Sequence, residues 1–136
     1  MIGHLHCLIV DCPDPGGLAT FYEQLLGLAR VEDTPEWVTL AAPGAGPAVA
    51  FQRVEPYVPP RWPAPEAPQH LHIDVLVDDL DEAEPEVLRL GATLLDGSDK
   101  PIGFRVYADP AGHPFCLVTP ESVTWSSADG PSAEDA

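Results

Sequence analysis

The residues with the most chemical potential in this sequence are histidines that open two similar apolar segments. His4 and His6 begin one segment near the N-terminus, and His70 and His72 begin a second, with Asp74 two residues further on. Imidazole nitrogens bind divalent metal ions, form hydrogen bonds and change charge near neutral pH. The chemistry open to these residues is therefore metal ligation or polar recognition of a small ligand.

Other catalytic patterns are missing from the sequence. It contains no G-x-S-x-G motif and no glycine-rich phosphate loop. The three cysteines, Cys7, Cys12 and Cys116, are an odd number without C-x-x-C spacing, which is typical of neither a disulfide framework nor a zinc ribbon. We expect reduced thiols.

Composition excludes several classes of partner. The chain has 136 residues, with 22 acidic and 6 basic side chains and a formal net charge of −16. Nucleic acids and anionic membranes would be repelled by such a surface. The N-terminus has no cationic region before its apolar stretch, and no apolar run approaches the ~20 residues of a membrane-spanning helix. These features predict a cytoplasmic protein of one domain.

Two pairs of segments repeat at nearly the same offset. The segment 4–11 is similar to 70–77, at an offset of 66, and 38–43 is similar to 105–110, at an offset of 67. Internal similarity in conserved order predicts two copies of one supersecondary unit.

Each half is predicted to form a strand, a helix and three strands. In the first half, Asp14-Pro15 is typical of a helix start and Gly27 of a helix end, with Leu18, Phe21, Tyr22 and Leu25 on one apolar stripe. The predicted strands are 4–11, 29–33, 36–42 and 48–54, then 70–77, 93–95, 104–108 and 114–119, with a second helix over 81–90. The sequence therefore predicts an α+β fold of two βαβββ modules.

The two modules occupy about 2–55 and 69–119 of a single domain, 1–119. Between them, residues 56–68 contain six prolines in 13 positions, which favours an extended connector over a helix or central strand. The segment 120–136 is small, polar and acidic, and we expect it to be disordered.

This pattern resembles the vicinal-oxygen-chelate superfamily, which includes glyoxalase I, bleomycin-resistance proteins and extradiol dioxygenases. Three motifs carry the resemblance: Asp14-Pro15 with Phe21-Tyr22 and Leu25-Leu26-Gly27, His72 with Val77-Asp78-Asp79-Leu80, and Asp109-Pro110-Ala111-Gly112-His113-Pro114-Phe115-Cys116. The resemblance implies a glyoxalase-like fold, in which the sheets curve into a cup that holds a ligand or a metal ion.

Strand alternation indicates which side chains face this cup. In 70–77, Leu71, Ile73, Val75 and Val77 form an apolar face for the helices, which leaves His70, His72 and Asp74 facing the cup or the solvent. By the same alternation we expect Arg105, Tyr107 and Cys116 on the cup side.

The first strand has two registers that exclude each other. Matching its histidines to His70 and His72 places His4 and His6 in the cup and Leu5, Cys7 and Ile9 in the core. Counting back from Asp14 instead, as family members are spaced, places Cys7 at the site. We favour the histidine register.

The resemblance implies metal ligands on the first and last strands of each half. His72 keeps such a ligand, Cys116 stands where glutamate is usual, and Gln52 is the one side chain that could coordinate near the end of the first half. Asp74 shares a face with His72, but residues two apart on a strand are separated by ~6.6–6.8 Å, which is wide for one ion. The carboxylate ligand is therefore missing from the expected pattern.

We therefore favour a cup that binds a small organic molecule without a firmly held metal. Trp37, Trp62 and Tyr107 could line it or fill the gap between modules, and Arg105 could clamp an anion or pair with a nearby carboxylate. The alternative is a metal-dependent lyase, isomerase or ring-cleaving dioxygenase, with zinc, nickel or iron on His72 and His6. Relatives often pair, so the resemblance is also compatible with a homodimer.

Overall fold

The chain folds into two modules with the same order of elements, as the duplicated sequence pattern predicts. The computed structural model describes residues 1–44, 46–97 and 103–123, so most of the predicted acidic tail, 124–136, lies outside the described residues. The first module consists of β1 (Cys7–Cys12), α1 (Pro15–Leu26), β2 (Ala29–Asp33), β3 (Trp37–Ala41) and β4 (Ala48–Arg53). The second consists of β5 (Ile73–Leu76), α2 (Leu80–Leu90), β6 (Thr93–Asp96), β7 (Phe104–Ala108) and β8 (Pro114–Val118).

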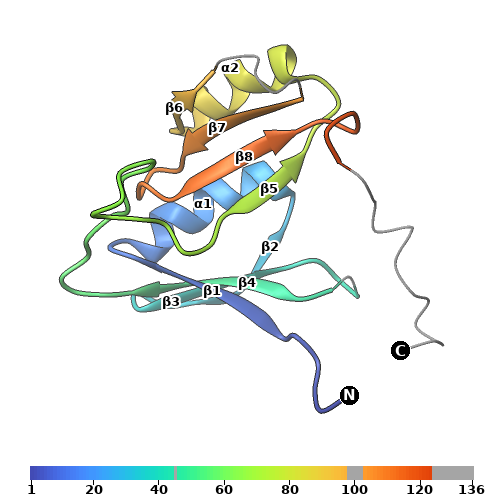
Figure 1. Cartoon of the computed structure of the whole chain (residues 1–136). Coiled ribbons are helices and arrows are strands. Elements are labelled where there is room, and N and C mark those ends of the chain that lie inside the picture. Colours follow the sequence, from blue (N-terminus) through green and yellow to red (C-terminus); the bar gives the residue numbers. More distant parts are fainter. Residues whose placement is uncertain (45, 98–102, 124–136) are drawn as a thin grey trace.

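Each module contains one four-stranded mixed sheet. The strand orders are β1-β4-β3-β2 and β5-β8-β7-β6 (Figure 1). In both sheets the first and last strands of the module are parallel and the other pairs are antiparallel. The register even shifts at matching places, in β2 and in β6. The predicted α+β fold of two βαβββ modules is confirmed.

The helix boundaries follow from capping residues. The side chain of Asp14 accepts a hydrogen bond from the Gly17 amide at 3.2 Å, and Gly27 ends α1 in the left-handed region at φ 68°. In α2, Asp79 accepts a hydrogen bond from the Glu82 amide at 3.0 Å. These contacts satisfy backbone groups that a helix terminus leaves unpaired.

One hydrophobic core joins the two modules, and α1 lies at its centre. The predicted stripe of α1 is confirmed, because Leu18, Phe21 and Tyr22 are all buried. Tyr22 stacks on Phe51 of β4 at 5.3 Å between ring centroids, and Phe21 meets Phe115 of β8 edge-on at 5.8 Å. The helix α1 therefore contacts both sheets, consistent with its position in Figure 1.

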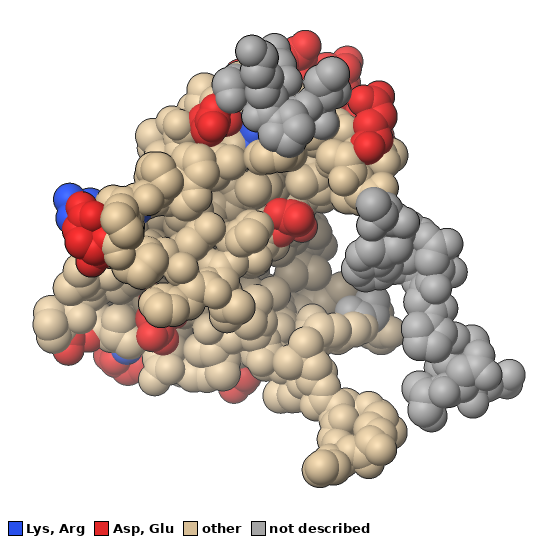
Figure 2. Space-filling model, viewed as in Figure 1, with Lys and Arg blue, Asp and Glu red and all other residues tan. Residues whose placement is uncertain are grey.

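The segment between β4 and β5 forms neither helix nor strand, in agreement with its proline content. No helix among the described residues is long and apolar enough to span a membrane. Acidic side chains outnumber basic ones on the face drawn in Figure 2, where the surface is also hollowed between the modules.

The first strand adopts the register that we did not favour. β1 begins only at Cys7, and the preceding His4 and His6 are exposed. Val10 and Cys12 belong to the core, whereas Ile9 is 47% exposed, so the histidine register is wrong. Val10 is aligned with the fully buried Phe51 of β4, and this pairing turns Cys7, Ile9 and Asp11 to the opposite face.

In the second module, β5 is shorter than predicted. It covers only Ile73–Leu76, and the preceding Leu71 is 76% exposed, so the prediction that Leu71 lies in the core is wrong. Ile73 and Val75 pack into the core as expected. His72 and Asp74 are exposed.

The predicted facing of β7 is also wrong. Tyr107 is fully buried in the core, and its hydroxyl donates to Glu84 of α2 at 3.0 Å. Tyr107 pairs with Phe115 and Arg105 pairs with Leu117, and directly opposed residues of antiparallel strands share a face. Because Phe115 and Leu117 are fully buried, Arg105 and Tyr107 lie on the helix side.

Candidate functional site

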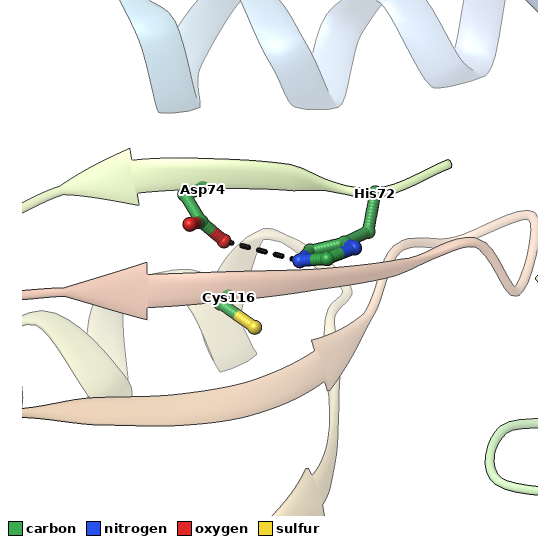
Figure 3. A group of neighbouring side chains, drawn as sticks. All are labelled: His72, Asp74 and Cys116. Atoms are coloured by element: carbon green, nitrogen blue, oxygen red, sulfur yellow. Dashed lines mark ion pairs between the residues drawn. The ribbon is translucent and has the colours of Figure 1, made fainter. Parts of the chain in front are cut away.

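Three side chains that can bind a metal ion meet on neighbouring strands of the second module. Asp74 of β5 is aligned with Cys116 of β8, and His72 immediately precedes β5. The Nε2 atom of His72 lies 3.4 Å from Oδ1 of Asp74, and one ligand atom of each of the three residues lies within 4.8 Å of the others (Figure 3). The side chains of His72 and Asp74 point toward each other. Their polar atoms are therefore close although their backbone positions are two residues apart.

The thiol of Cys116 is held in its neutral form. Burial raises its pKa to about 11, and the charge of Asp74 and a hydrogen bond with Asp74 act in the same direction. A bound divalent cation would lower the pKa of the Cys116 thiol, because a coordinating thiol loses its proton. Imidazole, carboxylate and thiolate together are a donor set that zinc accepts. The residues present therefore fit a zinc ion, with room for a fourth ligand.

A cavity of about 540 Å³ lies between the modules. It is lined by residues 8–11 of β1, residues 57–60 and 66–72 between β4 and β5, and Tyr22, Ile73, His113 and Pro114. Most of this lining is apolar. His72 belongs both to the cavity lining and to the group with Asp74 and Cys116, so the cavity and the group adjoin at this side chain.

A second histidine of the cavity lining, His113, joins the two modules. Its Nδ1 lies 2.9 Å from Oδ2 of Asp109, whose side chain is fully buried, and its Nε2 lies 2.7 Å from the backbone oxygen of Asp11 in β1. Tyr22 of α1 donates its hydroxyl to the same Asp109 oxygen at 2.7 Å, and the hydroxyl of Tyr57 lies 3.1 Å from Nε2. We call His113, Asp109 and Tyr22, with the Asp11 carbonyl, the module clasp.

The clasp favours a charged imidazole. Burial alone lowers the pKa of His113, but the hydrogen bond and charge of Asp109 and the Asp11 carbonyl outweigh it, and the net pKa lies above 6.5. Burial also raises the pKa of Tyr57 to about 12, so this hydroxyl keeps its proton at neutral pH. Our sequence reasoning missed His113. The sequence does contain an indication of its role: a histidine stands four residues after Asp109, at a position where the family that the chain resembles has asparagine.

The other predicted site residues lie elsewhere. Trp37 donates its indole N–H to Thr39 at 2.7 Å, and Thr39 donates to Glu32 at 2.9 Å. Among the described residues, the cavity lining and the His72 group do not include His6, Trp37, Gln52 or Trp62.

Arg105 is engaged by carboxylates rather than exposed to the cup. Its guanidinium lies 2.6 Å from Asp81 and 3.4 Å from Glu84, both on α2, and its side chain is 11% exposed. The hydrogen bond with Asp81 raises the pKa of Arg105; burial opposes this rise to a smaller extent, and the charge of Glu84 adds to it. Together with Tyr107, this arginine ties β7 to α2.

Comparison with known proteins places this geometry in a family. The profile of the glyoxalase-like domain matches residues 7–118. No curated protein matches the chain. A solved structure of a glyoxalase-related enzyme from Fulvimarina pelagi has a TM-score of 0.67 and 21% identity, with 96% of each chain covered.

Two further solved structures are similar in fold. The fosfomycin resistance protein FosX from Mesorhizobium loti has a TM-score of 0.63 and 17% identity, and the match covers 87% of this chain and 92% of that one. TnmS3, an antibiotic binding protein from Streptomyces sp. CB03234, has a TM-score of 0.55 and 22% identity, with 88% and 97% covered.

Proposed function

Because the chain belongs to the glyoxalase-like domain family, we propose that it binds a small organic molecule in the cavity between its modules. The observation that carries this proposal is the cavity itself, whose volume of about 540 Å³ is ample for such a molecule. Binding sites for small molecules are typically ~300–1,000 Å³, mostly apolar, with a few polar groups that fix orientation. Here His72, His113 and Tyr57 are such groups.

The polar groups of the lining favour a ligand that donates hydrogen bonds. The Oε1 atom of Gln69 is buried and has no hydrogen-bond partner among the described residues, which is an uncommon state for a buried polar atom. Asp11 and Glu66 also line the cavity, and its described lining contains no Lys or Arg. A neutral or cationic molecule with an N–H or O–H group therefore suits this cavity better than an anion.

A binding role agrees with one structural neighbour, since TnmS3 is an antibiotic binding protein. A second candidate function rests on the His72 group. A metal-dependent lyase, isomerase or ring-cleaving dioxygenase needs a cation that polarises substrate oxygens, and this group adjoins the cavity. In that case His72, Asp74 and Cys116 would hold the ion, and the cavity would hold the substrate.

Ligand-detected NMR with a panel of aromatic compounds tests the binding proposal. Each scaffold should be supplied in cationic, neutral and anionic forms, and hits should be quantified by titration calorimetry. We expect saturable binding by cationic or neutral members and weaker binding by the matched anions. A panel without a saturable ligand, or with a preference for anions, would contradict the proposal.

A matched pair of variants locates the site. Ile9 lines the cavity from an exposed strand position, so Ile9→Trp should fill part of the cavity and weaken binding at least about tenfold. Val31 is an equally β-branched exposed residue of β2 outside the lining, so Val31→Trp should leave the affinity unchanged. Equal effects of both variants would place the ligand elsewhere. Turnover of a bound compound would favour the enzymatic alternative.

A further inference from the structure

We infer that the imidazole of His113 is a pH-sensitive latch on the cavity, which joins β1 to the turn between β7 and β8 when it is protonated and releases β1 when it is neutral. This inference concerns the regulation of the cavity and rests on the function proposed above. His113 lines the cavity from the turn, residues 109–113, and Asp11 lines it from β1. The 2.7 Å contact between Nε2 of His113 and the Asp11 carbonyl therefore joins two walls of one cavity.

The surroundings of Nδ1 require this nitrogen to carry a proton. Nδ1 lies 3.0 and 2.9 Å from the two carboxylate oxygens of Asp109, whose side chain is fully buried. The same oxygens accept hydrogen bonds from the Tyr22 hydroxyl and from the backbone amides of Ala111 and His113. An ionised carboxylate only accepts hydrogen bonds, so Nδ1 must donate.

Nε2 of His113 also faces acceptors. The Asp11 carbonyl has no proton to donate, and the Tyr57 hydroxyl, 3.1 Å from Nε2, donates its own proton to the Ala111 carbonyl at 2.8 Å. An imidazole that must donate from both nitrogens is in its charged form. The structure with β1 joined to the turn is therefore the structure of a protonated His113, in agreement with the raised pKa of this residue.

Loss of one proton breaks the contact with β1. The remaining proton stays on Nδ1, because a hydrogen bond to the Asp109 carboxylate is charge-assisted. Nε2 then becomes an acceptor, and it can no longer bind the Asp11 carbonyl. The Tyr57 hydroxyl can turn to donate to Nε2, but it then leaves the Ala111 carbonyl. β1 thus loses its hydrogen bond to the turn, and the connector, residues 56–68, which lies beside the turn, exchanges one (Figure 1).

Each element in contact with His113 contributes one titrating side chain. These are Asp109 of its own turn, Asp11 of β1, Tyr22 of α1 through Asp109, and Tyr57 of the connector. Burial raises the pKa of both tyrosines, so they keep their protons at neutral pH. The cavity lining adds Glu66, His70 and His72. Among the direct contacts, His113 is the imidazole, the side chain that changes charge near neutral pH.

An NMR titration of the ligand-free full chain tests the latch by itself. The ring signals of His113 and the backbone amide signals of Cys12, which follows the Asp11 carbonyl, and of Tyr57 should shift with one common midpoint between about pH 6 and about pH 10. His113→Gln should remove this transition. Asp109→Asn, an isosteric change that removes the charge beside Nδ1, should move the midpoint to lower pH. Titration of the ring without a shift at Cys12 and Tyr57 would overturn the inference.

A second measurement asks how pH changes the affinity of the cavity. The probes are naphthamide and naphthylmethylguanidinium, because a neutral amide and a permanent cation keep their own charge over this pH range. Each should bind the wild type about fivefold more tightly at about pH 6 than at about pH 9, the factor that corresponds to one net hydrogen bond. By linkage, binding in alkaline solution should take up protons, which calorimetry in buffers of different ionisation enthalpy detects.

His70→Gln is the matched control, because His70 is also a histidine of the cavity lining but does not belong to the clasp. This variant should keep the pH dependence, whatever it does to the affinity itself, whereas His113→Gln should lose it. An affinity of the wild type that does not change with pH, or a pH dependence that survives in His113→Gln and disappears in His70→Gln, would overturn the inference. Failure of both probes to bind at any pH would contradict the proposed function, and the ligand-free titration then decides on the latch alone.

Discussion

Replacing His113 with glutamine should lower stability more in mildly acidic than in alkaline solution. The folded pKa of His113 lies above the usual 6.5, because the charge and hydrogen bond of Asp109 outweigh the effect of burial. A raised folded pKa means that the stabilisation is complete below the unfolded pKa and disappears as pH rises through the folded pKa. The wild type should therefore lose this contribution on alkalinisation, and the variant should not.

The magnitude follows from the two ring contacts. The Nδ1 contact with the buried Asp109 carboxylate, at 2.9 Å, is a charge-assisted hydrogen bond, which contributes about 1.5–3 kcal/mol. The Nε2 contact with the Asp11 carbonyl, at 2.7 Å, joins the modules and contributes about 1 kcal/mol. Asp109 keeps the Tyr22 hydroxyl in the variant, so the loss stays below that of a fully stranded carboxylate. We expect about 2–3 kcal/mol at about pH 6 and about half of that at about pH 9.

Urea unfolding of both proteins at the two pH values measures this difference. Other titrating groups are common to the wild type and His113→Gln, so their contributions cancel in the comparison. His4→Gln is the matched control, because His4 is exposed and lies before β1, and it should leave stability unchanged at both pH values. A loss that is equal at the two pH values, or larger in alkali, would show that the imidazole of the clasp is neutral and would refute the reasoning.

Further substitutions test the corrected facing of the strands by urea unfolding. Arg105→Met should lower the free energy of unfolding by about 1.5–3 kcal/mol, because Arg105 pairs with carboxylates of α2. It should leave the binding of anionic compounds unchanged. A specific loss of anion binding would support the hypothesis that Arg105 clamps an anion. Tyr107→Phe should cost about 0.5–1.5 kcal/mol through its lost hydrogen bond to Glu84, and no loss at all would contradict that contact. Leu40→Ala should cost about 2–5 kcal/mol, since Leu40 is fully buried, whereas Leu71→Ala should stay within about 0.5 kcal/mol; a large cost for Leu71 would return that residue to the core.

The sequence predicted the elements of the fold well because several local signals agree. In α1, the cap Asp14, the stop Gly27 and the stripe of Leu18, Phe21 and Tyr22 all point to the same helix, and all are confirmed. The repeat added the pairing of whole modules, which no single segment could indicate. Family resemblance and fold followed from these features together.

The face of the sheet to which each side chain points could not be predicted as well, because it depends on pairing with strands far along the chain. The two histidine pairs suggested an offset of 66 residues, but Val10 of β1 and Val75 of β5 both pack into the core, which corresponds to an offset of 65. A shift by one residue exchanges the faces of a strand. The identical histidines therefore gave the wrong alignment of the two first strands, and the burial of their side chains gives the correct one.

The candidate site could be predicted only in part. Strand alternation indicates the facing of His72, Asp74 and Cys116, but their mutual approach depends on the β5–β8 register and on side-chain orientation. Strand alternation predicted that Arg105 and Tyr107 face the cup, because they alternate with the apolar Phe104 and Val106. On the helix side, Arg105 and Tyr107 instead form hydrogen bonds with the carboxylates of Asp81 and Glu84, which are remote in sequence.

The union of the modules rests on side chains, since no ladder pairs a strand of one sheet with a strand of the other among the described residues. Aromatic rings of α1 and the module clasp hold the halves at their present separation. Phe21, Phe115 and Asp109 help to join the modules but do not line the cavity, so a substitution at one of them would change the width of the cavity and leave its lining residues the same. Ligand preference in this architecture can thus diverge through substitutions that never touch the ligand.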